Sequence, residues 1–211
     1  MPGIGERHDR ETPFPRGTRT TMTATNEHPY KRGISFDIMP IPPVPEHCVA
    51  VEAGPATFVV ESRLLTNEIL RTLPAGSVDA SGTVYDDYGA TVHVCDGADD
   101  VEYLRFDCFE SEPHYHYINP AQGENLICRI DEVAEGDPIE WTVGRLRDRL
   151  PDMLDLAGAH QLAGAVRAAP DDITSAIDRV ADLLHRAQIE AAALKTAGET
   201  AGDRSPGVSA D

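Results

Sequence analysis

The chain has 211 residues, of which 41% are hydrophobic and 26% are charged, and its 36 acidic and 18 basic side chains give a formal charge of −18. This composition is typical of one globular domain with polar extensions. A surface this acidic repels phosphate backbones and anionic lipid headgroups, and the apolar runs fall far short of the ~20 residues of a spanning helix. We therefore expect no nucleic-acid partner, no membrane span and, without a visible signal peptide, a cytoplasmic location.

The first 45 residues predict a disordered, proline-rich arm. Eight prolines block helices and strand ladders there, and apolar residues are few. Residues 34–43 are the exception, because their alternating apolar side chains could lie extended across a partner protein or across the chain's own domain.

Residues 46–130 predict an antiparallel β-meander, because turn residues divide them into short runs of β-forming residues. The expected strands lie at 48–52, 57–61, 82–85, 90–95, 101–109, 114–118 and 126–130. A short helix is expected within 62–73, where Leu65, Ile69, Leu70 and Leu73 recur at helical spacing.

The next segment changes to a helical period. Asp137 can cap a helix that begins at Pro138, and an apolar stripe then continues through residues 139–168. We expect Pro151 to kink or break this helix and Gly158 to end a segment of it.

A last helix is expected over residues 169–197, followed by a disordered tail at 198–211. Its apolar residues form a strict heptad, called here the heptad seam: Ile173, Ile177, Val180, Leu184, Ala187, Ala191 and Leu194. A 3.5-residue period is typical of a seam between helices. The seam can pack on the preceding helix or the sheet, or it can join two copies of the chain.

The densest set of candidate metal ligands lies in two expected strands. A turn at 110–113 places Asp107 opposite His116 if it has two or four residues, whereas a three-residue turn flips the face. In the first register His114, His116 and Asp107 project together, a His-x-His plus carboxylate set that suits Zn²⁺ or Fe²⁺, with Cys108 as the alternative ligand. The other interpretation is a hydrogen-bonded polar strand face without metal.

Pairing across the preceding turn decides which residues share that face. A turn centred on residues 98 and 99 pairs Cys95 with Glu102 and His93 with Leu104. Val92 and Val94 are then expected beside Asp107.

Other chemical signatures are absent from the sequence. Neither a dinucleotide-binding glycine motif nor a P-loop nor a G-x-S-x-G elbow occurs. The four cysteines include no C-x-x-C pair, which favours reduced, buried thiols over a disulfide framework.

The run Tyr103-Leu104-Arg105-Phe106-Asp107-Cys108-Phe109, followed by Pro113-His114-Tyr115-His116-Tyr117, resembles the signature of an uncharacterised bacterial family, a domain of unknown function. The resemblance covers roughly residues 45–155. It implies that the β-rich part and the first helix form one unit with the heptad helix as an appendage, and it implies no activity or cofactor.

These observations predict an α+β protein in which an antiparallel sheet of about five or six strands, within a domain at 46–168, is packed by C-terminal helices. The first functional hypothesis is a non-catalytic accessory or scaffold protein without a cofactor, which forms homo-oligomers through the heptad seam and binds a larger enzyme complex. The second is a small metal-dependent enzyme or metal-binding module that uses His114, His116 and Asp107. A third is a small-molecule binder with a pocket between sheet and helices.

Overall fold

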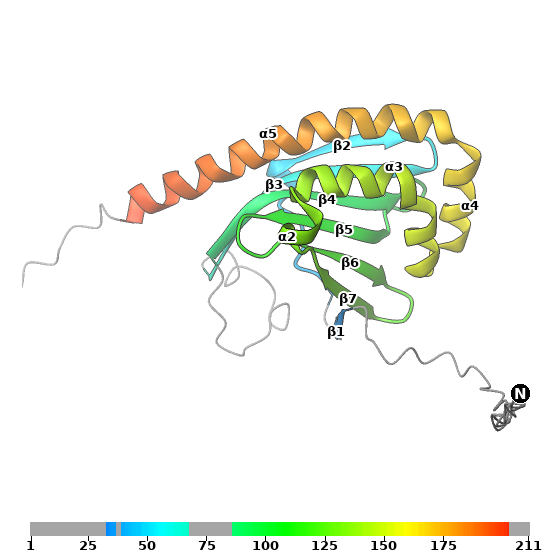
Figure 1. Cartoon of the computed structure of the whole chain (residues 1–211), viewed down its shortest axis with the longest axis horizontal. Coiled ribbons are helices and arrows are strands. Elements are labelled where there is room, and N and C mark those ends of the chain that lie inside the picture. The colour runs from blue at the N-terminus through cyan, green and yellow to red at the C-terminus, as the bar shows by residue number, and fades with distance from the viewer. Residues whose placement is uncertain (1–32, 37–38, 68–85, 203–211) are drawn as a thin grey trace, which may run out of the picture. The chain divides into compact units, whose positions relative to one another are not determined.

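The computed structural model describes residues 33–36, 39–67 and 86–202, with side chains up to residue 198. It shows the expected α+β fold, a seven-stranded antiparallel sheet with helices on one face (Figure 1). The strands are β1 (Ile34–Phe36), β2 (Cys48–Ala53), β3 (Ala56–Thr66), β4 (Asp86–Asp96), β5 (Glu102–Phe109), β6 (His114–Asn119) and β7 (Glu124–Arg129). The helices are η1 (Pro45–His47), α2 (Glu132–Glu135), α3 (Pro138–Leu156), α4 (His160–Ala168) and α5 (Pro170–Gly202).

The strand order is β1-β7-β6-β5-β4-β3-β2, so strands β2 to β7 form a meander. Within the region expected to be an arm, β1 pairs with β7 through residues 34–36. This segment therefore lies on the chain's own domain. Most of the expected arm (1–32), the expected strand at 82–85 and most of the tail lie outside the described residues.

The expected helix within 62–73 is wrong where the structure describes it. Residues 62–66 continue β3, which pairs with β4 from Ala56 to Thr66. Apolar spacing favoured a helix locally, but eleven successive cross-strand pairs stabilise the extended form. Ile69, Leu70 and Leu73 lie outside the described residues.

The pairing of β4 with β5 contains an irregularity that reverses one expected face. Cys95 faces Glu102 as predicted, but the next pair is Val94 with Leu104, so one residue of β5 is extra. His93 consequently faces Arg105 and not Leu104. Thr91 and His93, not Val92 and Val94, therefore lie beside Asp107, and the valines are completely buried in the core.

The pairing of β5 with β6 also differs from the expected register. Asp107 faces His114, and Arg105 faces His116. The shift from the expected Asp107–His116 pair is two residues, and an even shift keeps every side chain on its predicted face.

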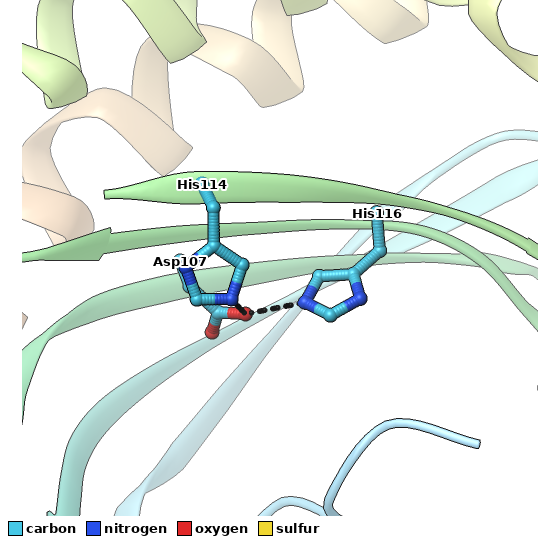
Figure 2. A group of neighbouring side chains, drawn as sticks. All are labelled: Asp107, His114 and His116. Carbon is cyan, nitrogen blue, oxygen red and sulfur yellow. Dashed lines mark hydrogen bonds and ion pairs between the residues drawn. The ribbon is translucent and has the colours of Figure 1, made fainter. Parts of the chain in front are cut away.

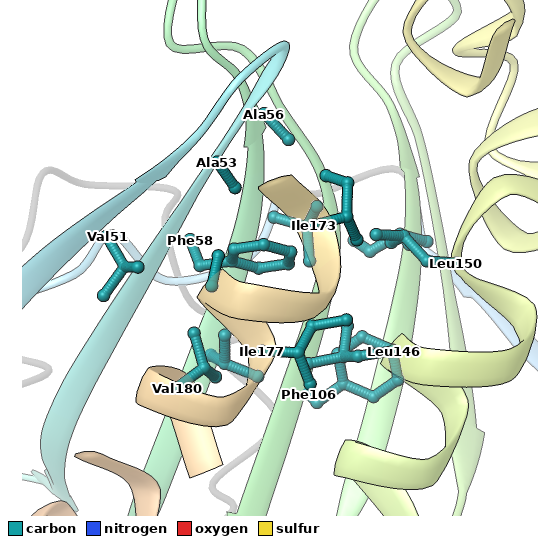
Figure 3. Close-up of a cluster of buried hydrophobic side chains, with 14 of the residues drawn as sticks. Val51, Ala53, Ala56, Phe58, Phe106, Leu146, Leu150, Ile173, Ile177 and Val180 are labelled. Carbon is teal, nitrogen blue, oxygen red and sulfur yellow. The ribbon is translucent and has the colours of Figure 1, made fainter. Parts of the chain in front are cut away.

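Helices α3 and α5 cover one face of the sheet and bury the main core (Figure 3). Phe58 of β3 and Phe106 of β5 are completely buried beneath them. Six residues of the heptad seam, Ile173, Ile177, Val180, Leu184, Ala187 and Ala191, are buried within the chain, while Leu194 is half-buried. The seam therefore packs on its own sheet, and self-association through these six side chains would require α5 to leave that position.

The expected helix over 139–168 is present as two helices. Asp137 caps α3 by accepting hydrogen bonds from the backbone N–H groups of Ile139 and Glu140. The helix continues through Pro151 and ends at Leu156, just before Gly158, whose φ of +86° suits glycine. Among the described helices, none is both long and apolar enough to cross a bilayer.

Two glycines offer a matched test of the sheet. A Cβ at Gly89 of β4 would lie 2.3 Å from the carbonyl oxygen of Cys108, whereas nothing lies within 4 Å of a Cβ at Gly144 of α3. We expect Gly89→Ala to lower the free energy of unfolding by about 1–3 kcal/mol, because the two strands must separate. Gly144→Ala is expected to raise it by roughly 0.5–1 kcal/mol, because alanine favours the helix. Urea unfolding measures the free energy of unfolding of both variants. Equal values for Gly89→Ala and Gly144→Ala would contradict the close strand packing at Gly89.

Candidate metal centre

The sheet face opposite the helices, called here the open face, carries a layer of buried polar side chains. They come from alternate positions of neighbouring strands and comprise Glu61, Arg63, Thr91, His93, Arg105, Asp107, His116 and Asn125. Residues 39–47, called here the strap, are tied to this face by hydrogen bonds to Glu61, Arg63 and Arg105. In the described part of the chain, no buried side-chain nitrogen or oxygen lacks a hydrogen-bond partner. Polar groups rather than apolar packing therefore organise this face.

Two histidines converge on one carboxylate oxygen within this layer. The Nε2 atom of His116 lies 3.0 Å from Oδ2 of Asp107, and Nε2 of His114 lies 3.4 Å from the same oxygen (Figure 2). Asp107 and His116 are buried, and His114 is partly exposed. We call these three residues the His-His-Asp group.

The outer nitrogen of each histidine faces an oxygen atom. Nδ1 of His114 lies 2.6 Å from the carbonyl oxygen of Glu112, and Nδ1 of His116 lies 2.8 Å from Oδ1 of Asn125. A carbonyl oxygen can only accept, so Nδ1 of His114 carries the proton. In a neutral His114 ring, Nε2 then presents its lone pair to the group, while Nε2 of His116 is hydrogen-bonded to Oδ2 of Asp107.

The charges of the group follow from its burial. Burial lowers the pKa of His114 and outweighs the opposing charge of Asp107, so the neutral ring is favoured. Burial alone would raise the pKa of Asp107, but the hydrogen bond from His116 and neighbouring positive charge, including that of Arg63, hold it well below its usual range. Thr91 also donates a hydrogen bond of 2.6 Å to Oδ1 of Asp107. The group thus presents an ionised carboxylate and a neutral imidazole.

The spacing of these atoms suits a transition-metal ion. In a tetrahedral zinc site with bonds of about 2.0–2.1 Å, neighbouring ligand atoms lie about 3.3 Å apart. The two Nε2–Oδ2 distances of 3.0 and 3.4 Å bracket that value, and one ligand atom from each residue lies within 4.8 Å of the others. Three protein ligands would leave a coordination position open.

The structure brings together His114, His116 and Asp107, as the sequence predicted, but not Cys108. The Cys108 side chain lies on the helix-covered face, where Sγ is 3.5 Å from Oγ1 of Thr142 in α3. Sequence reasoning missed Thr91 and Asn125 because both depend on strand pairing. The run Asp107-Cys108-Phe109 does not indicate which residue of β4 will face Asp107.

A second polar network lies beside the group on the open face. Arg105 makes two hydrogen bonds to Glu102, from Nε to Oε1 at 2.8 Å and from Nη2 to Oε2 at 2.7 Å. Glu61 accepts a hydrogen bond from Arg63, and His93 lies between the two glutamates. Burial would raise the pKa of Glu102, but hydrogen bonds from His93 and Arg105 lower it to about 2.

The depressed pKa of Glu102 predicts a dependence of stability on pH. Because the folded pKa of about 2 lies below the ordinary 4.5, the stabilisation is complete above about pH 4.5 and declines as the pH falls toward 2. Between about pH 6 and pH 3 we expect the wild type to lose roughly 2 kcal/mol more than Glu102→Gln in urea unfolding. The exposed Glu132→Gln variant should follow the wild type. Parallel curves for wild type and Glu102→Gln would contradict the ionised network.

Comparison with known proteins places the chain in a family. The family described as "Domain of unknown function (DUF7700)" matches residues 50–187, which is more than half of the chain, so the protein belongs to this family. The match contains the His-His-Asp group and most of α5, so the heptad helix belongs to the same unit rather than being an appendage. The searches of curated proteins and of solved structures returned no match.

Proposed function

We propose that this protein is a metal-binding module that holds one divalent transition-metal ion, Zn²⁺ or Fe²⁺, on Asp107, His114 and His116. The observation that carries the proposal is the convergence of both Nε2 atoms on Oδ2 of Asp107, at 3.0 and 3.4 Å. Imidazole nitrogen and carboxylate oxygen are ligands that these metals accept.

The surroundings of the group support metal binding more than a simple polar network. The neutral His114 ring directs the lone pair of Nε2 at the carboxylate, which repels it, whereas a cation bound between these two groups would turn the contact into an attraction. Oxygen partners on Nδ1, from Glu112 and Asn125, are the outer contacts that orient metal-binding histidines. Thr91 fixes the remaining carboxylate oxygen in the same way.

Titration of the metal-free, untagged full-length chain with Zn²⁺ against a coloured chelator tests the proposal. We expect saturation at one ion per chain, together with a rise in the unfolding temperature, because an ion that binds only the folded state stabilises it by about 2.7 kcal/mol at a free concentration of one hundred times Kd. Fe²⁺ is tested in the same way without oxygen. Failure of both ions to bind, or binding without stabilisation of the folded chain, would overturn the proposal.

A further inference from the structure

Two buried arginines of the open face donate to a single neutral oxygen. Nη2 of Arg63 lies 2.8 Å from the carbonyl oxygen of Ile41 in the strap, and Nη1 of Arg105 lies 2.6 Å from the same atom. Only 5% of Arg63 and 2% of Arg105 is exposed. Two guanidinium groups aimed at one point form an arrangement that recognises an oxyanion, because charge-assisted hydrogen bonds to a carboxylate are about twice as strong as those between neutral groups.

Each arginine is held in place by other contacts, so the orientation of its guanidinium group does not depend on the strap. Arg105 is fixed by its two hydrogen bonds to Glu102, and Nη1 of Arg63 is fixed by Oε2 of Glu61. The N–H groups that reach Ile41 come from the remaining edges of the two guanidinium groups. The arginine pair is therefore organised in advance for a ligand.

His93 and two glutamates complete the network around the pair. Nδ1 of His93 lies 2.7 Å from Oε1 of Glu102, and Nε2 lies 3.2 Å from Oε2 of Glu61. Burial would raise the pKa values of both glutamates, but their hydrogen bonds and the neighbouring arginines lower them, so both carboxylates are ionised and can only accept. The carbonyl of Ile41, in contrast to these carboxylates, offers the two guanidinium groups a neutral oxygen.

The strap is attached to the open face by few hydrogen bonds. Four of its nine residues, Pro40, Pro42, Pro43 and Pro45, have no backbone N–H. In the described part of the chain, its hydrogen bonds to the sheet are the two arginine contacts to Ile41, one of 2.8 Å from the Val44 N–H to Oε1 of Glu61, and one of 3.2 Å from the Cys48 thiol of β2 to the carbonyl oxygen of Val44. A ligand that replaces the carbonyl of Ile41 would leave the strap held by the two hydrogen bonds of Val44.

We propose that the Ile41 carbonyl occupies a carboxylate-binding subsite, and that a small carboxylate ligand displaces the strap and binds to Arg63 and Arg105. One carboxylate oxygen would accept from each guanidinium, so that charge-assisted hydrogen bonds replace the two bonds to a neutral carbonyl. Arg105 faces His116 across the strands, so the ligand would lie beside the His-His-Asp group. The subsite stands on the arginine pair alone and does not require the metal.

Acetate is the probe, added to the metal-free full-length chain at constant ionic strength with chloride as the control anion. ¹H–¹⁵N spectra report the Arg105 Nε–H and the Val44 amide. We expect saturable shifts at both with acetate and not with chloride, and faster hydrogen exchange at Val44 as its bond to Glu61 opens. Equal responses to acetate and chloride, or acetate binding that appears only after zinc is added, would overturn the subsite.

A variant pair separates this role from a purely structural one. Val44→Pro removes the N–H that ties the strap to Glu61, and the φ of −91° at this position has to shift by only about 10° to reach the range of −65 ± 15° that proline adopts. Because such a hydrogen bond contributes about 0.5–1.5 kcal/mol, we expect acetate to bind about two- to tenfold more tightly. Val44→Ala keeps the N–H and should bind acetate as the wild type does. Unchanged affinity in a folded Val44→Pro variant would contradict displacement of the strap.

The two proposals fail separately. Acetate binding without zinc binding would support the arginine subsite and refute the metal centre. Zinc binding without acetate binding to the metal-free chain would do the reverse.

Discussion

Replacing both His114 and His116 by alanine is expected to abolish stoichiometric zinc binding. The variant loses two of three ligands, so its affinity should fall by more than the roughly 10–100-fold that loss of an outer hydrogen-bond partner costs. Thr91→Val, which removes the hydroxyl that donates to Oδ1 of Asp107, should show that smaller loss. Competition with a chelator measures the zinc affinity of the wild type, of the double histidine variant and of Thr91→Val.

The matched control is His160→Ala. This histidine pairs with Asp155 at 3.0 Å, but 75% of its side chain is exposed and it lies in α4, outside the group. Its removal should leave zinc affinity unchanged. Zinc binding that persists in a folded His114→Ala, His116→Ala variant, or that disappears in His160→Ala, would place the ion elsewhere.

The second large effect concerns the heptad seam. Leu184 of α5 is completely buried in the core, so Leu184→Ala is expected to lower the free energy of unfolding by about 2–5 kcal/mol. Asp at Ile177 and Leu184 together should prevent folding, because two charges would enter the core without partners. Urea unfolding and circular dichroism measure both, with the 72% exposed Ile189→Ala expected to change stability by less than about 0.5 kcal/mol.

The same variants test whether the heptad seam instead joins two copies of the chain. If α5 joined two copies of the chain, aspartate at Ile177 and Leu184 would convert a folded oligomer into folded monomers. Packing of the seam on its own sheet predicts loss of the fold instead. Light scattering beside circular dichroism distinguishes the two, and a folded monomer would contradict the intramolecular packing.

Local signals in the sequence were sufficient for much of the fold. Asp137 and Pro138 marked the start of α3 because a capping carboxylate and a proline at the first helical position act within one turn. The period of the seam identified a long helix, but it could not say which surface the helix packs on. Pro151 did not end α3, because packing of Leu150 and Leu154 on the sheet side holds the helix on both sides of it.

The candidate site depended on strand pairing, which is a long-range property. His114, His116 and Asp107 were predicted together because alternate residues of a strand share a face, and an error of two residues in register preserves it. Thr91 and His93 were assigned to the wrong face because the irregularity between Val94 and Cys95 shifts the pairing by one residue. The contact of the strap with Arg63 and Arg105 joins segments far apart in the sequence, and no local pattern indicates it.

Zinc K-edge X-ray absorption of the zinc-loaded full-length chain tests the metal centre most directly. We expect a first shell of nitrogen and oxygen at about 2.0–2.1 Å with the outer scattering of two imidazole rings, and no sulfur. A sulfur shell near about 2.3 Å, or a first shell without imidazole scattering, would show that the ion is bound by other residues and contradict a site built on Asp107, His114 and His116.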